Sequence, residues 1–182
     1  MEFHVREYRA TDFDRLWQID QLCFPRGISY TQMELSGFIT QRNALTLVAE
    51  IDQSPADEEI SAFPARQQHD GGTLTAQLPG TASQTREIAG FVIAHCMRRK
   101  TGRIMTLDVV PEARRQGLAS QLMNACEGEL RSLGCTEIFL ETAVNNGPAL
   151  SLYHKLGYEI LRTLPDYYAS HSLDAFLMGK RL

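Results

Sequence analysis

The chain has 182 residues, of which 43% are hydrophobic and 22% are charged. This length is sufficient for a sizeable core, and we expect a single domain over residues 1–182. The net charge of −4 and a pI near 5.7 disfavour nonspecific binding to nucleic acid or to an anionic membrane, because both require a basic surface. The N-terminal segment has no uninterrupted hydrophobic run, so we expect neither a secretory signal nor a membrane span, and a cytoplasmic location.

The first part of the chain predicts two strands and two helices. Thr11 and Asp14 have the spacing of a capping box, which marks the start of a helix. That helix should bury a stripe of side chains that includes Leu16 and Leu22. The elements expected here are a strand over 3–8, a helix over about 11–23, a helix over 30–40 and a strand rich in β-forming residues over 44–51.

The composition changes abruptly over about residues 52–87. Ser, Ala, Pro, Gln, Thr, Gly and acidic residues dominate, and the scattered apolar residues have no clear period. We interpret this segment as a low-complexity insertion, partly mobile, between neighbouring strands.

The remainder of the chain alternates strands and helices, which predicts an α/β sheet covered on both faces. The basic segment 98–103 is expected to be a solvated hairpin tip. A helical stripe from Leu118 to Leu133 should be buried, and Gly134 should end that helix. The expected elements are strands over 88–97 and 104–110, a helix over about 117–133, a strand over 136–142, a helix over about 148–156 and, after an irregular stretch, a strand over 175–180.

The segment 109–119 joins an apolar strand to an amphipathic helix through a charged loop. A helix that begins near Gly117 leaves about four backbone N–H groups without intrahelical partners and carries roughly half a positive charge at that end. Gly117 allows a pyrophosphate to approach closely, and Arg114 and Arg115 add positive charge. The segment therefore predicts an anion site. The motifs of other nucleotide sites, GxxxxGK[ST] and an early GxGxxG, are missing.

The loop 114–119 also fits the R/Q-x-x-G-x-G/A loop of the GNAT acetyltransferase superfamily. Downstream, Glu141 within Leu-Glu-Thr, then Asn146, then the block 152–158 follow in an order that resembles bacterial ribosomal-protein-alanine N-acetyltransferases and protein N-terminal acetyltransferases. The resemblance is firm over 88–182, weaker before the insertion and absent from it. It implies an α/β fold with a mixed, splayed central sheet, helices on both faces, and acetyl-CoA as co-substrate in the opening.

Within this resemblance, the pyrophosphate is expected at the helix start, and the pantetheine amides beside the preceding strand as an extra edge. Asn146 matches an asparagine that contacts the cofactor, and an equally weighted alternative is that it caps the helix opening at Gly147. The residues expected to bind acetyl-CoA are Leu107, Val109, Arg114, Arg115, Gln116, Gly117, Leu118, Ala119 and Asn146.

Attack of an amine on a thioester requires loss of a proton, because the pKa is near 8 for an α-amine and near 10.4 for lysine. The resemblance implies Glu141 as the general base and Tyr153 as the general acid. The alternatives are a solvated strand glutamate and a tyrosine that only packs. Cys126 and Cys135 have no evident histidine partner, so we expect direct attack in a ternary complex rather than an acyl-cysteine. The five histidines show no metal-ligand spacing, and no metal is expected.

The acceptor is the least defined part of the prediction. Residues 27–30 and Ala143 depart from the subfamily pattern, which often has Pro-Trp-Ser and an arginine there, near the expected acceptor groove. Tyr30, Tyr167 and Tyr168 are candidates to line that groove, with ordinary surface or core tyrosines as the alternative. We expect acetylation of the N-terminal α-amine of a protein or peptide. A lysine or small-molecule amine acceptor, or a catalytically silent acyl-CoA-binding module, are the alternatives.

Overall fold

The computed structural model of the chain describes residues 2–52, 86–98, 100–169 and 172–182. Its strands are β1 (Phe3–Glu7), β2 (Ala44–Asp52), β3 (Arg86–Met97), β4 (Thr101–Val109), β5 (Glu137–Ala143), β6 (Glu159–Tyr168) and β7 (Leu173–Arg181). Its α-helices are α1 (Phe13–Cys23), α2 (Gln32–Ile39), α3 (Leu118–Ser132) and α4 (Gly147–Lys155). No helix in these four ranges is long and apolar enough to cross a membrane.

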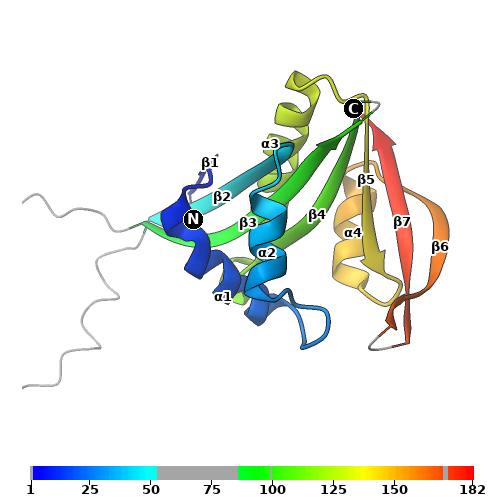
Figure 1. The fold of residues 1–182 in the computed structure, drawn as a ribbon, viewed down its shortest axis with the longest axis horizontal. Coiled ribbons are helices and arrows are strands. Elements are labelled where there is room, and N and C mark those ends of the chain that lie inside the picture. Colours follow the sequence, from blue (N-terminus) through cyan, green and yellow to red (C-terminus); the bar gives the residue numbers. More distant parts are fainter. Residues whose placement is uncertain (1, 53–85, 99, 170–171) are drawn as a thin grey trace, which may run out of the picture.

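The strands form one mixed sheet in the order β1-β2-β3-β4-β5-β7-β6. Figure 1 shows α1 and α2 in front of this sheet and α3 behind it, and both groups contact the β2–β4 region. Only β4 and β5 are parallel neighbours, and every other neighbouring pair is antiparallel. The α/β class, the mixed sheet and the helices on both faces are therefore confirmed.

The sheet opens between β4 and β5. Their pairing is limited to three positions, of which Arg103 opposite Phe139 is the last, although both strands continue beyond it. Figure 1 shows the two strands parting from the end that lies near the C-terminus. Met105 is an additional residue in β4, since Ala94 faces Ile104 and Ile93 faces Thr106. Such a bulge bends and twists its strand. The splay therefore begins where β4 changes its register against β3.

Helix α3 buries one face, as the sequence predicts. Leu118, Leu122, Cys126 and Leu130 are all almost fully buried. Leu133 is 60% exposed, so its expected burial is wrong: it follows the last helical residue and leaves the stripe. Gly134, with φ of +85°, takes the left-handed conformation that commonly ends a helix, as expected.

The start of α1 differs from the prediction. A short 3₁₀ turn, Ala10–Asp12, precedes the helix, and the Asp12 carboxylate accepts the N–H of Arg9 over 2.7 Å. The threonine capping box lies instead at α2, where Thr31 and Glu34 bond each other's backbone N–H. Helix α2 is consequently shorter than the expected 30–40. Leu22 is 62% exposed, and the buried stripe of α1 continues through Ile19 and Asp20.

The expectation of an irregular stretch before the last strand is wrong, because most of that stretch forms β6. This strand pairs only with β7, lies at the sheet edge and is largely exposed. An edge strand with little buried surface carries no alternating apolar pattern, and it tolerates a proline such as Pro165. These two properties concealed it in the sequence.

Residues 53–85, most of the expected insertion, lie outside the described residues. The flanking positions Asp52 and Arg86 face each other as the last pair of the antiparallel neighbours β2 and β3. The expected boundaries of 52 and 87 therefore include the ends of two strands. The turn between β3 and β4 is also shorter than the expected 98–103, because β4 already begins at Thr101.

Candidate active site

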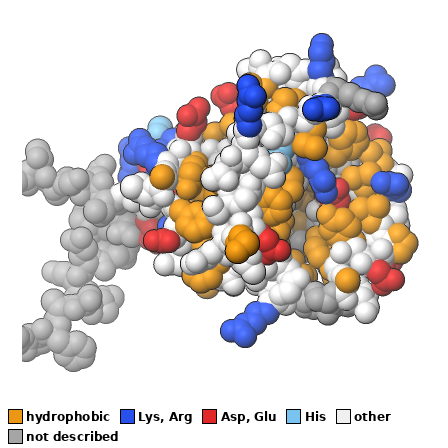
Figure 2. Space-filling view, viewed as in Figure 1, with side chains coloured by type: hydrophobic (Ala, Val, Ile, Leu, Met, Phe, Trp, Pro, Cys, Tyr) orange, Lys and Arg blue, Asp and Glu red, His pale blue; other side chains and the backbone are white. Residues whose placement is uncertain are grey.

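A cleft of about 1110 Å³ lies where β4 and β5 separate. Its walls come from the α1–α2 connection, β4 and the loop after it, α3, β5, α4 and the ends of β6 and β7. Figure 2 shows hydrophobic side chains gathered on this face of the molecule, on both sides of a furrow. The predicted site residues that line the cleft are Tyr30, Leu107, Val109, Arg114, Arg115, Gly117, Leu118, Ala119, Glu141, Asn146, Tyr153 and Tyr168, and those that do not are Gln116 and Tyr167.

The loop between β4 and α3 has the geometry of an anion site. Arg115 and Gly117 take left-handed conformations, with φ of 59° and 88°. The first α-helical bond of α3 runs from the Gln121 N–H to the Gly117 carbonyl, so the preceding N–H groups have no carbonyl one turn earlier to bond. Alternating conformations of this kind direct successive N–H groups toward one concavity. The backbone of this loop therefore suits a phosphate.

Two side chains of this loop, Arg114 and Gln116, already donate hydrogen bonds to the protein backbone. The Arg114 guanidinium donates to the Val109 carbonyl over 2.9 Å and lies 3.5 Å from the Cys23 sulfur, so it covers the end of β4. The Gln116 amide donates to the Glu112 carbonyl over 2.7 Å. Arg115 is exposed and lines the cleft, as does Lys155 at the end of α4, which sequence analysis missed.

After its last pair with β5, β4 has a backbone edge that no neighbouring strand of the described residues covers. The carbonyl of Met105 accepts the Tyr30 hydroxyl over 3.2 Å, and the carbonyl of Val109 accepts from Arg114 and from the Cys23 thiol. Because backbone groups alternate along a strand, Leu107, midway between them, directs its N–H and carbonyl toward the same edge. Leu107 is thus placed to pair with an extended ligand, whereas the Val109 carbonyl is already engaged.

Glu141 and Tyr153 approach the cleft from different elements. Glu141, on β5, lies just past the last β4–β5 pair, and its carboxylate is 3.0 Å from the Arg103 guanidinium. Tyr153 lies on the inner face of α4, is 7% exposed and packs against the ring of Tyr158. Burial raises the pKa of Tyr153, so its hydroxyl stays protonated at neutral pH. The site therefore places a carboxylate and a neutral phenol along one cleft.

Asn146 caps α4. Its side-chain oxygen accepts the N–H of Ala149 over 3.3 Å, the interaction that the capping alternative predicts. The same residue lines the cleft, so capping brings the asparagine to the position at which a cofactor contact is expected.

The three predicted acceptor tyrosines have different environments. Tyr30 is held by Met105 and packs edge-on against Phe38, and burial raises its pKa. Tyr168, at the end of β6, lines the cleft, and burial raises its pKa to about 12. Tyr167 instead contacts Arg103 and is 43% exposed. Tyr30 and Tyr168 therefore belong to the cleft walls, and Tyr167 lies outside them.

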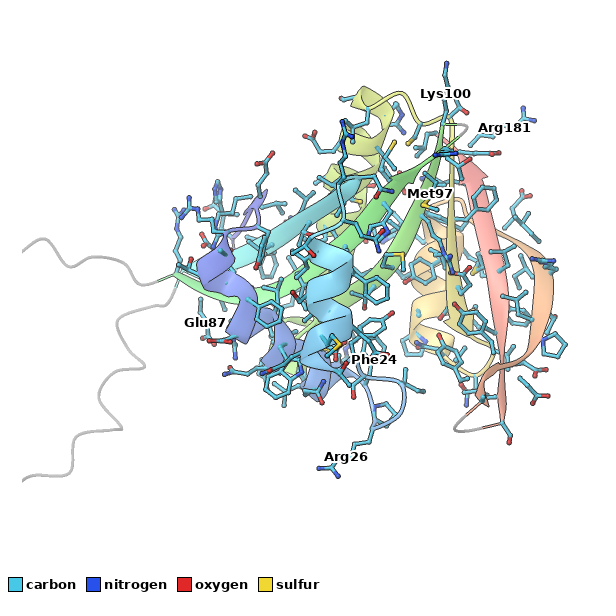
Figure 3. The ribbon with its side chains drawn as sticks, in the orientation of Figure 1. Phe24, Arg26, Glu87, Met97, Lys100 and Arg181 are labelled. Carbon is cyan, nitrogen blue, oxygen red and sulfur yellow. The ribbon has the colours of Figure 1, made fainter. Side chains whose placement is uncertain are left out.

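Sequence analysis missed the end of α1 and the residue after it. Cys23 and Phe24 line the cleft although no motif marks them. Ile28 and Ala143, expected near the acceptor groove, line the cleft as well. In Figure 3, Phe24 lies near the start of α2, whereas Arg26 points away from the fold. A Phe-Pro pair directly after a helix end, followed by Gly27 with φ of 89°, was the available signal for a loop that closes over the sheet.

Two buried carboxyl groups lie beside the cleft. Asp108 is 1% exposed and accepts the Thr106 hydroxyl over 2.6 Å, while Asp20 is fully buried and accepts the N–H of Tyr30 over 2.8 Å. One oxygen of each has no partner among the described residues. Burial raises the pKa of Asp20 to about 6, and burial together with the charge of Asp20 raises the pKa of Asp108 well above its usual value.

The variant Asp20→Asn is expected to be more stable than the wild type at pH 8 but not at pH 4. The pKa of Asp20 is higher in the folded state than in the unfolded state, so the native state binds its proton more readily. The wild type therefore loses stability as the pH rises from about 4 through 6. Asparagine keeps an oxygen that accepts the Tyr30 N–H and removes the charge. The free energy of unfolding at pH 8 should therefore rise by up to about 3 kcal/mol. Urea unfolding at both pH values, with exposed Asp14→Asn as the control, measures it. Equal differences at the two pH values would contradict the prediction.

The part of the chain that the structure describes contains no group of three or more His, Cys, Asp or Glu side chains placed to hold a metal ion. The groups assembled at the cleft are the loop between β4 and α3, the open edge of β4, the Glu141 carboxylate and the Tyr153 phenol. This set suits proton transfer beside an extended, phosphate-bearing ligand.

Comparisons with known proteins identify the family and the fold. A family model described as "Acetyltransferase (GNAT) family" matches residues 13–158. The N-alpha-acetyltransferase of Sulfurisphaera tokodaii is 27% identical over 182 residues, covering 100% of this chain and 94% of the relative. The ribosomal-protein-S18-alanine N-acetyltransferase from Escherichia coli has a TM-score of 0.71 at 17% identity, covering 99% of this chain and 94% of that one. Arabidopsis thaliana NAA60 in complex with acetyl-CoA has a TM-score of 0.74 at 20% identity, with 100% of both chains covered.

Proposed function

The chain belongs to the acetyltransferase (GNAT) family, and from this premise we propose that it acetylates the N-terminal α-amine of a protein or peptide with acetyl-CoA. The observation that carries the proposal is that Glu141 and Tyr153 line the same cleft as the loop 114–119. The α-amine is supported by the likeness of the whole chain to an enzyme named N-alpha-acetyltransferase. Retention of both proton-transfer groups argues against a silent binding module.

The residues present fit acetyl-CoA, which supplies the acetyl thioester. The left-handed positions Arg115 and Gly117 and the start of α3 suit the pyrophosphate, and Lys155 adds a second exposed cation to the cleft lining. Leu107 offers its N–H and carbonyl to a pantetheine amide on the open edge of β4. Leu118 and Ala119 supply further N–H groups at the helix start, and Asn146 faces the same cleft.

Within this arrangement, Glu141 takes the proton of the attacking amine, either directly or through one water. Tyr153 donates its proton to the departing thiolate, because burial keeps the phenol neutral at the working pH. Tyr30 and Tyr168 line the cleft together with the apolar residues Phe24 and Ile28, and we assign the acceptor to this part of its wall. The lining there is aromatic and apolar, so an acceptor with an uncharged first side chain fits it best.

The acceptor is tested with one peptide sequence in four forms: free or blocked N-terminus, each with or without an internal lysine. Free CoA is measured over time, and mass spectrometry locates the acetyl group. We expect turnover on both peptides with a free N-terminus and none on the blocked peptide that contains lysine.

Three other outcomes would reject the proposal. Turnover on the blocked lysine peptide without turnover on free N-termini would assign the enzyme to lysine side chains. Turnover only on small amines would favour a small-molecule acceptor. Tight acetyl-CoA binding without turnover on any amine would identify a binding module. Separately, acetyl-enzyme formed without an acceptor would reject direct transfer in a ternary complex but not the identity of the acceptor.

A further inference from the structure

Arg103 contacts the carboxylate of Glu141 without lining the cleft. Its Nη2 lies 3.0 Å from one carboxylate oxygen, and its Nε donates to the other over 3.3 Å. This is a two-point contact that restrains the direction of the carboxylate as well as its position. The Glu141 side chain is 13% exposed and that of Arg103 38%, so the guanidinium lies on the more open side of the pair.

Arg103 lies at the point in the sheet where β4 and β5 stop pairing. Arg103 opposite Phe139 is the last β4–β5 pair, and Glu141 is the next β5 residue on the same face as Phe139. No backbone pairing beyond this point ties the two strands together. The Tyr167 hydroxyl of β6 is a further partner of the guanidinium. Arg103 therefore joins β4, β5 and β6 where the splay opens.

The expectation that the whole basic segment 98–103 is a solvated tip is consequently wrong for Arg103. Arg98 and Lys100 belong to the turn and are exposed, whereas Arg103 is the third residue of β4 and forms an ion pair with Glu141, whose side chain is 13% exposed. In Figure 3, Lys100 marks the closed end of the splay and projects away from the fold.

We infer that Arg103 is a positioning residue that holds the carboxylate of Glu141 in the orientation needed for proton transfer, an inference that rests on the proposed role of Glu141 as base. A carboxylate offers about four lone-pair positions, and the guanidinium fork occupies two of them. The others remain for the amine or a bridging water. Lysine at this position would keep the charge but not the two-point geometry.

The test compares Arg103→Gln, Arg103→Lys, Glu141→Gln and the double variant Arg103→Gln/Glu141→Gln, with Arg98→Gln as a matched control from the same basic segment. We expect Arg103→Gln to lower kcat about 10-fold or more, with the KM for acetyl-CoA within about twofold. Arg103→Lys should recover only part of the loss. In the Glu141→Gln background, Arg103→Gln should change kcat by less than about twofold, because Arg103 acts through that carboxylate.

The outcomes separate the inference from the proposed function. An unchanged kcat in Glu141→Gln would reject both the base and the positioning role. If kcat falls in Glu141→Gln but is normal or higher in Arg103→Gln, only the positioning role is rejected. The same conclusion follows if the double variant loses as much additional kcat as Arg103→Gln loses on its own. A second readout needs no acceptor: the Nε–H of Arg103 should exchange slowly with solvent in NMR spectra and rapidly in Glu141→Gln. Rapid exchange in the wild type would overturn the inference.

Discussion

Replacing Glu141 with glutamine is expected to lower kcat by about 10²-fold or more while leaving the affinity for acetyl-CoA within about twofold. Glutamine keeps the size of the side chain but cannot accept a proton from the amine at neutral pH. The residues proposed to hold acetyl-CoA come from β4, the loop after it, α3, α4 and its N-cap residue Asn146, none of which includes Glu141. Steady-state kinetics with the best acceptor peptide and equilibrium binding of acetyl-CoA measure the two effects separately.

Glu137→Gln is the matched control for this experiment. Glu137 lies on the same strand and face as Glu141 but at the closed end of the splay, where it accepts the Thr101 hydroxyl over 3.2 Å. Its replacement should leave kcat within about twofold. An unchanged rate in Glu141→Gln, or an equal loss in both variants, would remove Glu141 from the role of base.

Replacing Lys180 with methionine is expected to reduce the free energy of unfolding by about 3–5 kcal/mol. The ammonium of Lys180 lies 2.7 Å from the Glu127 carboxylate and donates to the Leu156 carbonyl over 2.8 Å, just after α4. The Glu127 side chain is only 5% exposed, and its other oxygen accepts the Tyr158 hydroxyl over 3.0 Å. Methionine would leave a buried carboxylate without its cation, and urea unfolding at pH 7.5 measures the cost.

Two further variants isolate the charge. Arg181→Met, at an exposed position next to Lys180, should change stability by less than about 0.5 kcal/mol. Glu127→Gln combined with Lys180→Met should recover much of the loss, because the amide needs no counter-charge. If the double variant is no more stable than Lys180→Met alone, the cost comes from lost packing of the lysine stem rather than from the unpaired carboxylate.

The left-handed entrance to α3 and the helix itself were predictable because their signals are local. Gly117 marks a left-handed entrance, the stripe through Leu122 has the helical period, and Gly134 ends the helix, so each feature depends on residues close together in the chain. The resemblance then placed Glu141 and Tyr153 in order along the chain. Their roles remain predictions, although both side chains line the cleft.

The contacts made across the fold were not predictable. Arg103 reads as part of a basic turn, and only the β4–β5 pairing brings it to Glu141, 38 positions later. No sequence pattern marks Asp20 or Asp108, and only the packing of α1 against β4 buries both of them. The edge strand β6 has no periodic pattern because most of its side chains are exposed.

By itself, the sequence determined the α/β class, the glycine-marked loop at the start of α3, and the order of that loop, Glu141 and Tyr153 along the chain. These depend on helical and strand periodicity and on backbone preferences, which act over a few residues. Only the tertiary structure decided that Arg103 holds Glu141, that two carboxyl groups are buried beside the cleft, and that Lys180 neutralises Glu127. The physical reason is that burial and pairing of charges depend on which distant elements pack together, and no local pattern encodes those distances.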